Sequence, residues 1–140
     1  MKIRKATMKD AERILQLLNN DKKLSVNGRI GDFNKYDVTD YITKKICETF
    51  VYEENDKIIG AIVCQFWSKY FHINLIVVDR EYQRKGVGKS LIKSMESMAK
   101  KRGIEDIELI TEIKNTQMQS LLKKLKYKRG HKFFAYSKEI

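Results

Sequence analysis

The chain has 140 residues, of which 42% are hydrophobic and 34% charged, a composition that excludes a disordered chain and predicts one packed domain over residues 1–140. Lysine and arginine (29) outnumber aspartate and glutamate (18), and the net charge of +11 favours an anionic partner such as nucleic acid, a membrane surface or a phosphate-bearing cofactor. No apolar run reaches the roughly 18 residues that a membrane helix needs, and no secretory signal is visible. We therefore expect a cytoplasmic location and no membrane partner.

The two cysteines predict free thiols. Cys47 and Cys64 lie in apolar stretches, and neither belongs to a C-x-x-C pair. A disulfide framework or a zinc site needs several cysteines or histidines at characteristic spacings. We therefore expect two buried thiols in a reducing compartment, and no metal site.

The first half of the chain predicts a strand, a helix, a loop, a second helix and two strands joined by a turn. These elements span 2–6, 8–20, 21–35, 38–47, 49–52 and 57–67, with the turn at 53–56. The first helix begins with Thr7 and Asp10 in capping-box spacing, and apolar residues recur behind them at helical intervals. Asp37 is the expected cap of the second helix.

The second half predicts a strand, a long helix ending at Gly103, a strand, a helix and a closing strand. The strands span 71–78, 107–111 and 133–137, and the last helix spans 116–124. The end of strand 71–78 is apolar on both faces, which is typical of a central strand covered by helices. His131 follows Gly130 and predicts a tight turn before the closing strand. Strands first, then alternating helices and strands, indicate an α/β fold with a mixed β-sheet flanked by helices.

The segment from Val77 to Ser90 joins a buried strand, a basic loop and the start of an amphipathic helix. Gly86 and Gly88 allow backbone N–H groups to approach a ligand closely. The first turn of a helix adds unpaired N–H groups and the positive end of its dipole. Positive side chains come from Arg84, Lys85 and Lys89. Together these features predict a binding site for an anion such as phosphate.

A nucleotide-binding P-loop is the first motif to consider, because Gly88-Lys89-Ser90 matches its end. The motif requires a glycine at position 83, where this chain has Gln83. Strand 107–111 also ends without an aspartate for magnesium. The P-loop interpretation therefore fails.

The spacing Gln83-x-x-Gly86-x-Gly88 resembles the Q/R-x-x-G-x-G/A signature of the GNAT superfamily, the Gcn5-related N-acetyltransferases. The resemblance extends to the order of strands and helices along essentially the whole chain. It implies the GNAT fold and the binding of acetyl-CoA, with the strand backbone on the pantetheine arm and the loop N–H groups on the pyrophosphate. The implied cofactor-binding residues are Ile76, Val77, Val78, Gln83, Arg84, Lys85, Gly86, Val87, Gly88, Lys89 and Asn115.

The same resemblance implies a general base six residues before the valine that ends the strand, and that residue is His72. A histidine titrates near neutral pH, which suits proton removal from an amine. Regular alternation along the strand puts His72, Asn74 and Ile76 on one face. The alternative is that His72 only packs beside its aromatic neighbours Tyr70 and Phe71.

A tyrosine on the last helix often protonates the leaving thiolate in such proteins, and its position is occupied by Leu122 here. Tyr127 and Tyr136 are near in sequence but do not match that position. Relatives that acetylate protein N-termini also carry a glutamate where this chain has Ile110, and Glu112 is a reserve candidate two residues later. Neither cysteine has a partner base, so direct transfer is expected rather than a covalent acyl-enzyme.

The sequence therefore predicts an acetyl-CoA-dependent N-acetyltransferase that acts on a primary amine of a small molecule, protein or peptide, with a homodimer as a possible assembly. Acidic residues that could form the acceptor pocket are Asp32, Asp37, Asp40 and Glu112. The alternative is a non-catalytic acyl-CoA-binding regulator of the same fold, which the leucine at position 122 favours. A nucleic-acid-binding module is the third interpretation; it rests on charge alone, because no zinc finger, RNA-binding signature or basic arm is present.

Overall fold

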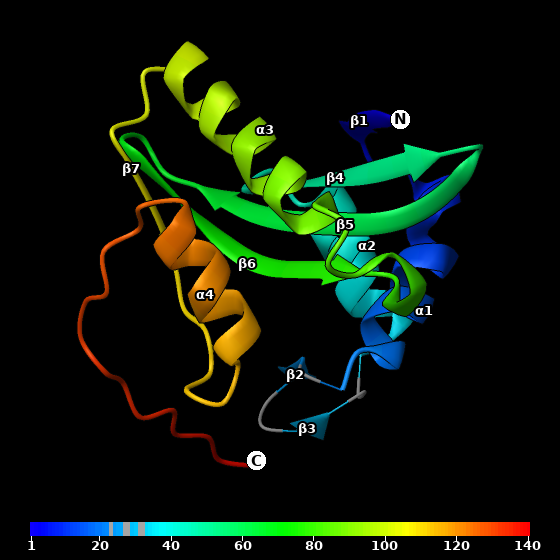
Figure 1. The fold of residues 1–140 in the computed structure, drawn as a ribbon. Helices are drawn as coiled ribbons and strands as arrows, with labels where there is room; N and C mark the ends of the chain where they lie inside the picture. Colours follow the sequence, from blue (N-terminus) through cyan, green and yellow to red (C-terminus); the bar gives the residue numbers. More distant parts are fainter. Residues whose placement is uncertain (23, 27–28, 31–32) are drawn as a thin grey trace. The chain divides into compact units, whose positions relative to one another are not determined.

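The computed structural model describes residues 1–22, 24–26, 29–30 and 33–140. The chain divides into two compact units, residues 1–110 and 111–140, and each is described by itself. The first unit contains a five-stranded sheet in the order β1-β4-β5-β6-β7 (Figure 1). Neighbouring strands are antiparallel except for the parallel pair of β6 and β7. The strands span Lys2–Lys5 (β1), Cys47–Glu54 (β4), Lys57–Phe66 (β5), Tyr70–Val78 (β6) and Asp106–Leu109 (β7).

Helices cover both faces of this sheet in the first unit, with α3 on one face and α1 and α2 on the other (Figure 1). Their bounds are Ala11–Asn20 (α1), Lys35–Thr43 (α2) and Val87–Lys101 (α3). Single 3₁₀ turns precede α1 and α3, at Met8–Asp10 and Arg80–Tyr82. Within the part of the chain that is described, no helix is long and apolar enough to cross a membrane. The mixed sheet with flanking helices confirms the predicted fold class.

The core under α1 and α2 is built from residues in register across three strands. Val51, Ala61 and Val77 are partners on β4, β5 and β6, and all three are buried. Partners in a sheet project to the same face, so these side chains form one apolar row. The helical residues that pack on this row include Ile14, Leu17, Leu18 and Val38. The opposite face is covered by the buried α3 residues Leu91, Ile92 and Met95.

Three expectations about secondary structure are corrected. The second helix begins at Lys35 and ends at Thr43, and Asn34 is its cap: the Asn34 side chain accepts from the N–H groups of Tyr36 and Asp37. Asp37 is instead the third helical residue, and its carboxylate accepts from the Asn34 N–H at 2.8 Å. A two-stranded ribbon, Ser25–Val26 (β2) with Arg29–Ile30 (β3), lies in the segment expected to be a loop.

The second unit contains α4, Thr116–Lys124, as predicted, but no strand over 133–137. Phe133, Phe134 and Tyr136 are exposed, and no strand among the described residues pairs with this segment. An alternating apolar pattern becomes a strand only where a partner strand satisfies its backbone. The turn expected at His131 lacks a strand on either side for the same reason.

Candidate functional site

Strand β7 is short and pairs with only the first half of β6. The parallel pairing runs from Tyr70, opposite Asp106, to Ile73, opposite Leu109, and stops there. Beyond Ile73, no strand of the described chain pairs with that edge of β6, although β5 continues to pair with the other edge as far as Val78. The predicted pantetheine-binding residues Ile76, Val77 and Val78 therefore lie where this edge has no partner strand. An open edge presents main-chain N–H and C=O groups that a ligand can bind, apart from the Val78 carbonyl, which accepts from the Gln83 side chain.

A β-bulge at Asn74 lies where this edge opens. Ile73 is opposite Cys64 and Leu75 is opposite Val63, so Asn74 is an extra residue without a partner on β5. Its side-chain Oδ1 is buried and accepts no hydrogen bond from the described residues. A buried acceptor without a donor is costly, which points to a ligand group that satisfies it.

The bulge overturns one expectation about the base candidate. His72 is opposite Gln65, and Ile76 is opposite Ile62, three residues away on β5. Because facing partners share a side and alternate residues change sides, His72 and Ile76 lie on opposite faces of the sheet. His72 shares its face with Leu75 and Val77, the face that carries α1 and α2. The predicted alternation missed one extra residue.

The loop after β6 has the geometry of an anion site. Gln83 fixes it to the strand, because its side-chain Nε2 donates to the Val78 carbonyl at 3.1 Å. Arg84 (φ 61°) and Gly86 (φ 85°) have left-handed backbone conformations. Successive residues of opposite handedness turn their N–H groups to the same side and form a nest for an anion. In the described part of the chain, the N–H groups of Arg84, Lys85 and Gly86 donate to no main-chain carbonyl.

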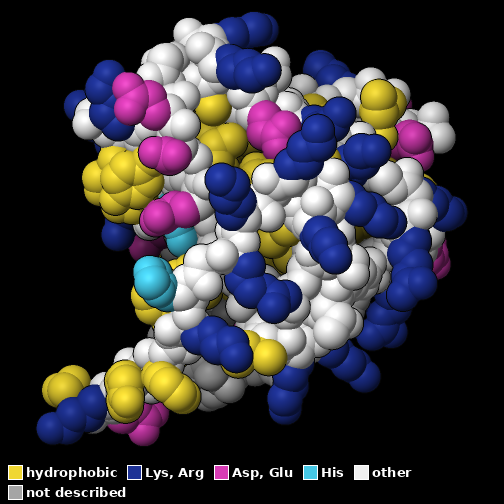
Figure 2. Space-filling view, turned by 60° about the vertical axis from the view of Figure 1, so that its left-hand side comes forward, with side chains coloured by type: hydrophobic (Ala, Val, Ile, Leu, Met, Phe, Trp, Pro, Cys, Tyr) yellow, Lys and Arg dark blue, Asp and Glu magenta, His cyan; other side chains and the backbone are white. Residues whose placement is uncertain are grey.

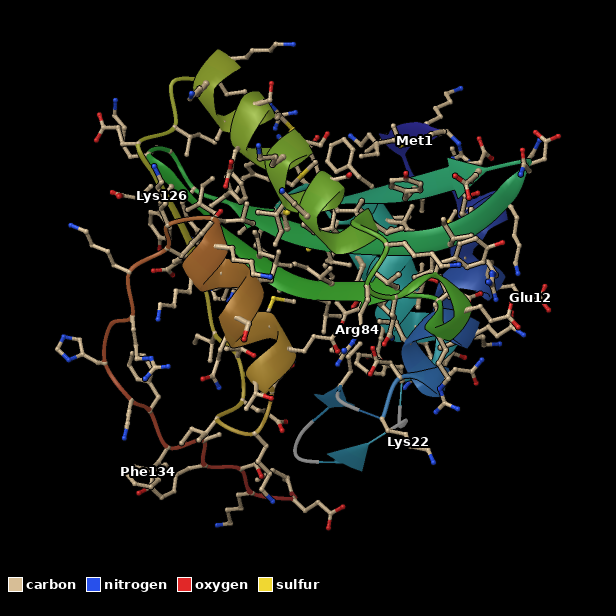
Figure 3. All side chains as sticks on the ribbon, in the orientation of Figure 1. Met1, Glu12, Lys22, Arg84, Lys126 and Phe134 are labelled. Carbon is tan, nitrogen blue, oxygen red and sulfur yellow. The ribbon has the colours of Figure 1, made fainter. Side chains whose placement is uncertain are left out.

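Helix α3 begins directly at this loop. Gly86 is its cap residue, and the Gly86 carbonyl accepts from the Ser90 N–H at 2.9 Å. The first N–H groups of α3, those of Val87, Gly88 and Lys89, have no acceptor within the helix and extend the loop site. A Cβ atom added at Gly86 would meet nothing within 4 Å, so the space over this backbone is open. Figure 3 shows Arg84 in the loop that leads into α3.

Arg13 on α1 connects the segment after β6 to α1 and β5. Its guanidinium donates to the Ile58 carbonyl at 3.0 Å and to the carboxylate of Asp79, the residue after β6. The Asp79 carboxylate also accepts from the Glu81 N–H and lies 3.7 Å from the Lys57 ammonium. Partial burial would raise the pKa of Asp79, but these hydrogen bonds and positive charges outweigh it and lower the pKa below its usual range.

A cavity of about 450 Å³ adjoins the same junction. Val78, Asp79 and Gln83 contribute to its wall, together with Arg13 and Leu17 of α1. The cavity is therefore lined partly by residues predicted to bind the cofactor. It offers space for a ligand next to the open strand edge.

Gly60 on β5 sets the distance between the sheet and the start of α3. A Cβ atom at this position would lie 3.0 Å from Val87 Cγ1 and 3.3 Å from Leu91 Cδ1. Glycine is therefore required for the helix to approach the strand this closely. Sequence reasoning did not single out Gly60, although a glycine inside a strand is a known sign of close approach.

His72 has a carboxylate neighbour that the sequence did not suggest. Its Nδ1 lies 3.4 Å from Oε1 of Glu108, the residue opposite it on β7. The His72 side chain is 21% exposed and that of Glu108 is 63% exposed. The His72 imidazole is thus partly exposed, and a carboxylate lies within ion-pair distance of its Nδ1.

The remaining predicted residues belong to the second unit. The side chain of Asn115 caps α4 by accepting from the Met118 N–H at 3.2 Å. The Leu122 carbonyl accepts from the Tyr127 N–H at 2.9 Å. Glu112 also lies in this unit, whereas Asp32 lies outside the described residues.

Cys47 and Cys64 are both free and buried. Burial raises the pKa of the Cys64 thiol to about 12, so it stays protonated at neutral pH. Among the described residues, no group of three histidine, cysteine or acidic side chains could hold a metal ion. Lysine and arginine side chains are spread widely over the face shown in Figure 2, as the net charge of +11 requires.

Comparisons with known proteins agree with this geometry. Residues 11–127 match the family model described as the acetyltransferase (GNAT) family. The chain is 28% identical over 94 residues to N-alpha-acetyltransferase 30 of Schizosaccharomyces pombe, covering 61% of this chain and 63% of that protein. It is 31% identical over 86 residues to N-alpha-acetyltransferase 30 of Xenopus laevis, covering 58% of this chain but only 32% of that protein.

A solved structure, that of a possible acetyltransferase from Clostridium difficile 630, superposes with a TM-score of 0.78. The superposition covers 99% of this chain and 98% of the other at 21% identity, which shows a shared fold. The family match covers most of the chain and includes the open strand edge, the bulge and the glycine loop. The chain therefore belongs to the acetyltransferase (GNAT) family.

Proposed function

We propose that the protein is an acetyl-CoA-dependent N-acetyltransferase that moves the acetyl group directly to a primary amine. The observation that carries this proposal is the edge of β6 after Ile73, which pairs with no described strand and leads into the loop before α3. An open strand edge followed by a phosphate site matches a ligand with an amide-containing arm joined to a pyrophosphate. Coenzyme A has this order of groups.

The residues present fit that ligand. The main chain of Ile76 to Val78 offers hydrogen bonds to the amides of the pantetheine arm, and the N–H groups of Arg84 to Lys89 offer them to the pyrophosphate. The unsatisfied Asn74 Oδ1 at the start of the opening accepts from an N–H group of the arm or of the acceptor. The positive charge of the chain attracts the anionic ligand.

His72 is the proposed general base. It takes a proton from the acceptor amine as the amine nitrogen attacks the thioester carbonyl carbon. The new C–N bond forms, the C–S bond breaks, and the electron pair of that bond leaves with sulfur as a thiolate. Because residue 122 is leucine, the thiolate takes its proton from solvent or from a tyrosine elsewhere in the chain. Bound acetyl-CoA supplies the activated acetyl group.

The first acceptors to test are peptides with a free N-terminal amine, because the curated relatives are named N-alpha-acetyltransferases. The chain spans 63% and 32% of their lengths in the matched regions, so their activity is a hypothesis for this protein. Small-molecule amines form the second arm of the screen. The two buried free thiols support a reducing, cytoplasmic location as part of this proposal.

The test combines coenzyme A calorimetry with detection of released thiol over a panel of peptides and amines. We expect binding, and thiol release that depends on an acceptor. His72→Ala should lower kcat/KM by roughly 10²-fold without changing coenzyme A affinity, since a general base contributes ~10²–10⁴ in rate. The control is Gln65→Ala, which removes the cross-strand neighbour of His72 and should leave the rate within a few-fold.

Two results would contradict the proposal in different ways. Failure to bind coenzyme A removes the cofactor assignment. Tight binding without thiol release from any acceptor supports the alternative of a non-catalytic acyl-CoA-binding regulator.

A further inference from the structure

We propose that Glu108 is the positioning residue of His72, holding its imidazole in the tautomer that leaves Nε2 free to accept a proton. The inference rests on the proposed function, in which His72 is the base. Its evidence is the 3.4 Å separation between Glu108 Oε1 and His72 Nδ1.

The backbone places the two residues side by side. His72 and Glu108 are direct partners in the parallel ladder between β6 and β7. Three further residue pairs hold the strands in that register: Tyr70 with Asp106, Phe71 with Ile107, and Ile73 with Leu109. This register brings the side chains of the two residues next to each other on one face of the sheet.

The chemistry of the contact selects one ring nitrogen. A neutral imidazole carries one N–H, and the partner of one nitrogen determines which nitrogen holds the proton. A carboxylate accepts and does not donate, so it stabilises the form with the proton on Nδ1. The lone pair is then on Nε2. After proton transfer, the imidazolium carries both N–H groups, and the same carboxylate compensates its charge.

The role is assigned to one carboxylate. Within the described residues, Glu108 is the acidic side chain that lies within 4 Å of His72. Glu105, near the start of the same strand, is instead 3.6 Å from the Lys69 ammonium. Glu105 and Glu108 have similar exposures, 67% and 63%, so Glu105→Gln is a matched control for Glu108→Gln. Both variants remove one negative charge from the same end of the sheet.

The first test reads the tautomer without any activity. Nitrogen-15 NMR of the histidine rings, recorded where His72 is neutral, distinguishes Nδ1–H from Nε2–H. The chain has two histidines, and the spectrum of His72→Ala assigns the signals. We expect mainly Nδ1–H in the wild type and in Glu105→Gln, and a shift towards Nε2–H in Glu108→Gln. Glutamine keeps one acceptor oxygen, so Glu108→Ala, which removes it, completes the test. An unchanged tautomer in both Glu108 variants overturns the inference, whatever the protein catalyses.

The second test is a kinetic double-mutant cycle. Glu108→Gln should lower kcat by about three- to tenfold, less than the ~10²-fold expected for loss of the base itself, with the KM for acetyl-CoA unchanged. In the His72→Ala background, Glu108→Gln should have no further effect. An equal loss in both backgrounds means that Glu108 acts on the acceptor and not through His72. Absence of acetyl transfer in the wild type contradicts the proposed function and leaves the tautomer measurement as an independent result.

Discussion

Arg13 on α1 and Asp79 at the end of β6 form an ion pair across 66 positions of sequence. The pair joins α1 to the first residue of the segment between β6 and α3, residues 79–86. It is partly buried, with side-chain exposures of 24% and 15%. Because Arg13 also donates to the Ile58 carbonyl, one guanidinium links α1, β5 and the loop.

Replacing this arginine should cost stability in a pH-dependent way. Arg13→Met is expected to lower the free energy of unfolding by about 1 kcal/mol at pH 7, as for a partly exposed charged hydrogen bond. The folded pKa of Asp79 is lowered, so its stabilising contribution is full above the unfolded pKa of ~3.9 and is lost as the pH falls through the folded value. The difference between the variant and the wild type in urea unfolding should therefore shrink as the pH falls below about 4, leaving the part that comes from the Ile58 carbonyl.

Lys57→Met is the control for that measurement. It removes the longer contact of Asp79, 3.7 Å from the carboxylate, on a half-exposed side chain. Its cost at pH 7 should be smaller than that of Arg13→Met. Equal losses of unfolding free energy in the two variants would show that the Arg13–Asp79 ion pair stabilises the fold no more than the Lys57 contact does.

Gly86→Val should abolish coenzyme A binding and leave the fold intact. Valine is β-branched and tolerates the left-handed backbone of Gly86 poorly, so the loop N–H groups should turn away from the anion. The matched control is Gly103→Val at the other end of α3. Gly103 has a similar φ of 68° and equally open surroundings, so the backbone strain is comparable. Calorimetry should show that only the Gly86 variant loses its affinity for coenzyme A. Equal affinities of the two variants would mean that the loop does not bind the cofactor.

Gly60→Ala should displace the start of α3. The added Cβ comes within 3.2 Å of the Val77 carbonyl oxygen and 3.0 Å of the Val87 side chain. We expect a loss of about 1–3 kcal/mol from overpacking, together with weaker coenzyme A binding. Val87→Ala removes the Cγ1 atom that the new methyl group meets. Chemical unfolding of the double variant should therefore show a smaller loss than the sum of the two single variants. If the losses in unfolding free energy of the two single variants simply add in the double variant, the contact between residue 60 and Val87 does not determine the position of the helix.

Leu122→Tyr tests how the thiolate leaves. The family resemblance places an acid at this position, and restoring it should raise kcat at pH values where thiolate departure limits the rate. Steady-state kinetics with saturating acetyl-CoA would measure the change. If kcat does not rise, Tyr127 and Tyr136 are the next residues to test as the acid that protonates the thiolate.

Local sequence signals predicted the parts of the site that depend on local geometry. The glycine loop and the start of α3 follow from Gln83, Gly86 and Gly88, because turns and helix starts are determined by neighbouring residues. The position of the second helix cap was missed, since Asn34 and Asp37 both suit a cap and only the structure shows which one begins the helix.

Features that depend on residues far apart in the chain could not be predicted from the sequence. Nothing near Asn74 signals that β5 leaves it unpaired, so alternation assigned His72 to the wrong face. The contact with Glu108 needs the register of two parallel strands joined through α3, which no local pattern specifies. Segment 133–137 has the composition of a strand, but pairing decides whether such a segment becomes one.

The extra residue at position 74 divides β6 into two parts that can vary separately. The alternation of side chains between the two faces of the sheet is shifted by one residue after position 74, while the backbone remains one continuous strand. A change of side chain at position 72 can therefore alter the proposed base without disturbing the strand edge that follows. Deleting a single residue at the bulge would undo this arrangement, because the imidazole would turn to the α3 side of the sheet although every other residue of the strand was retained.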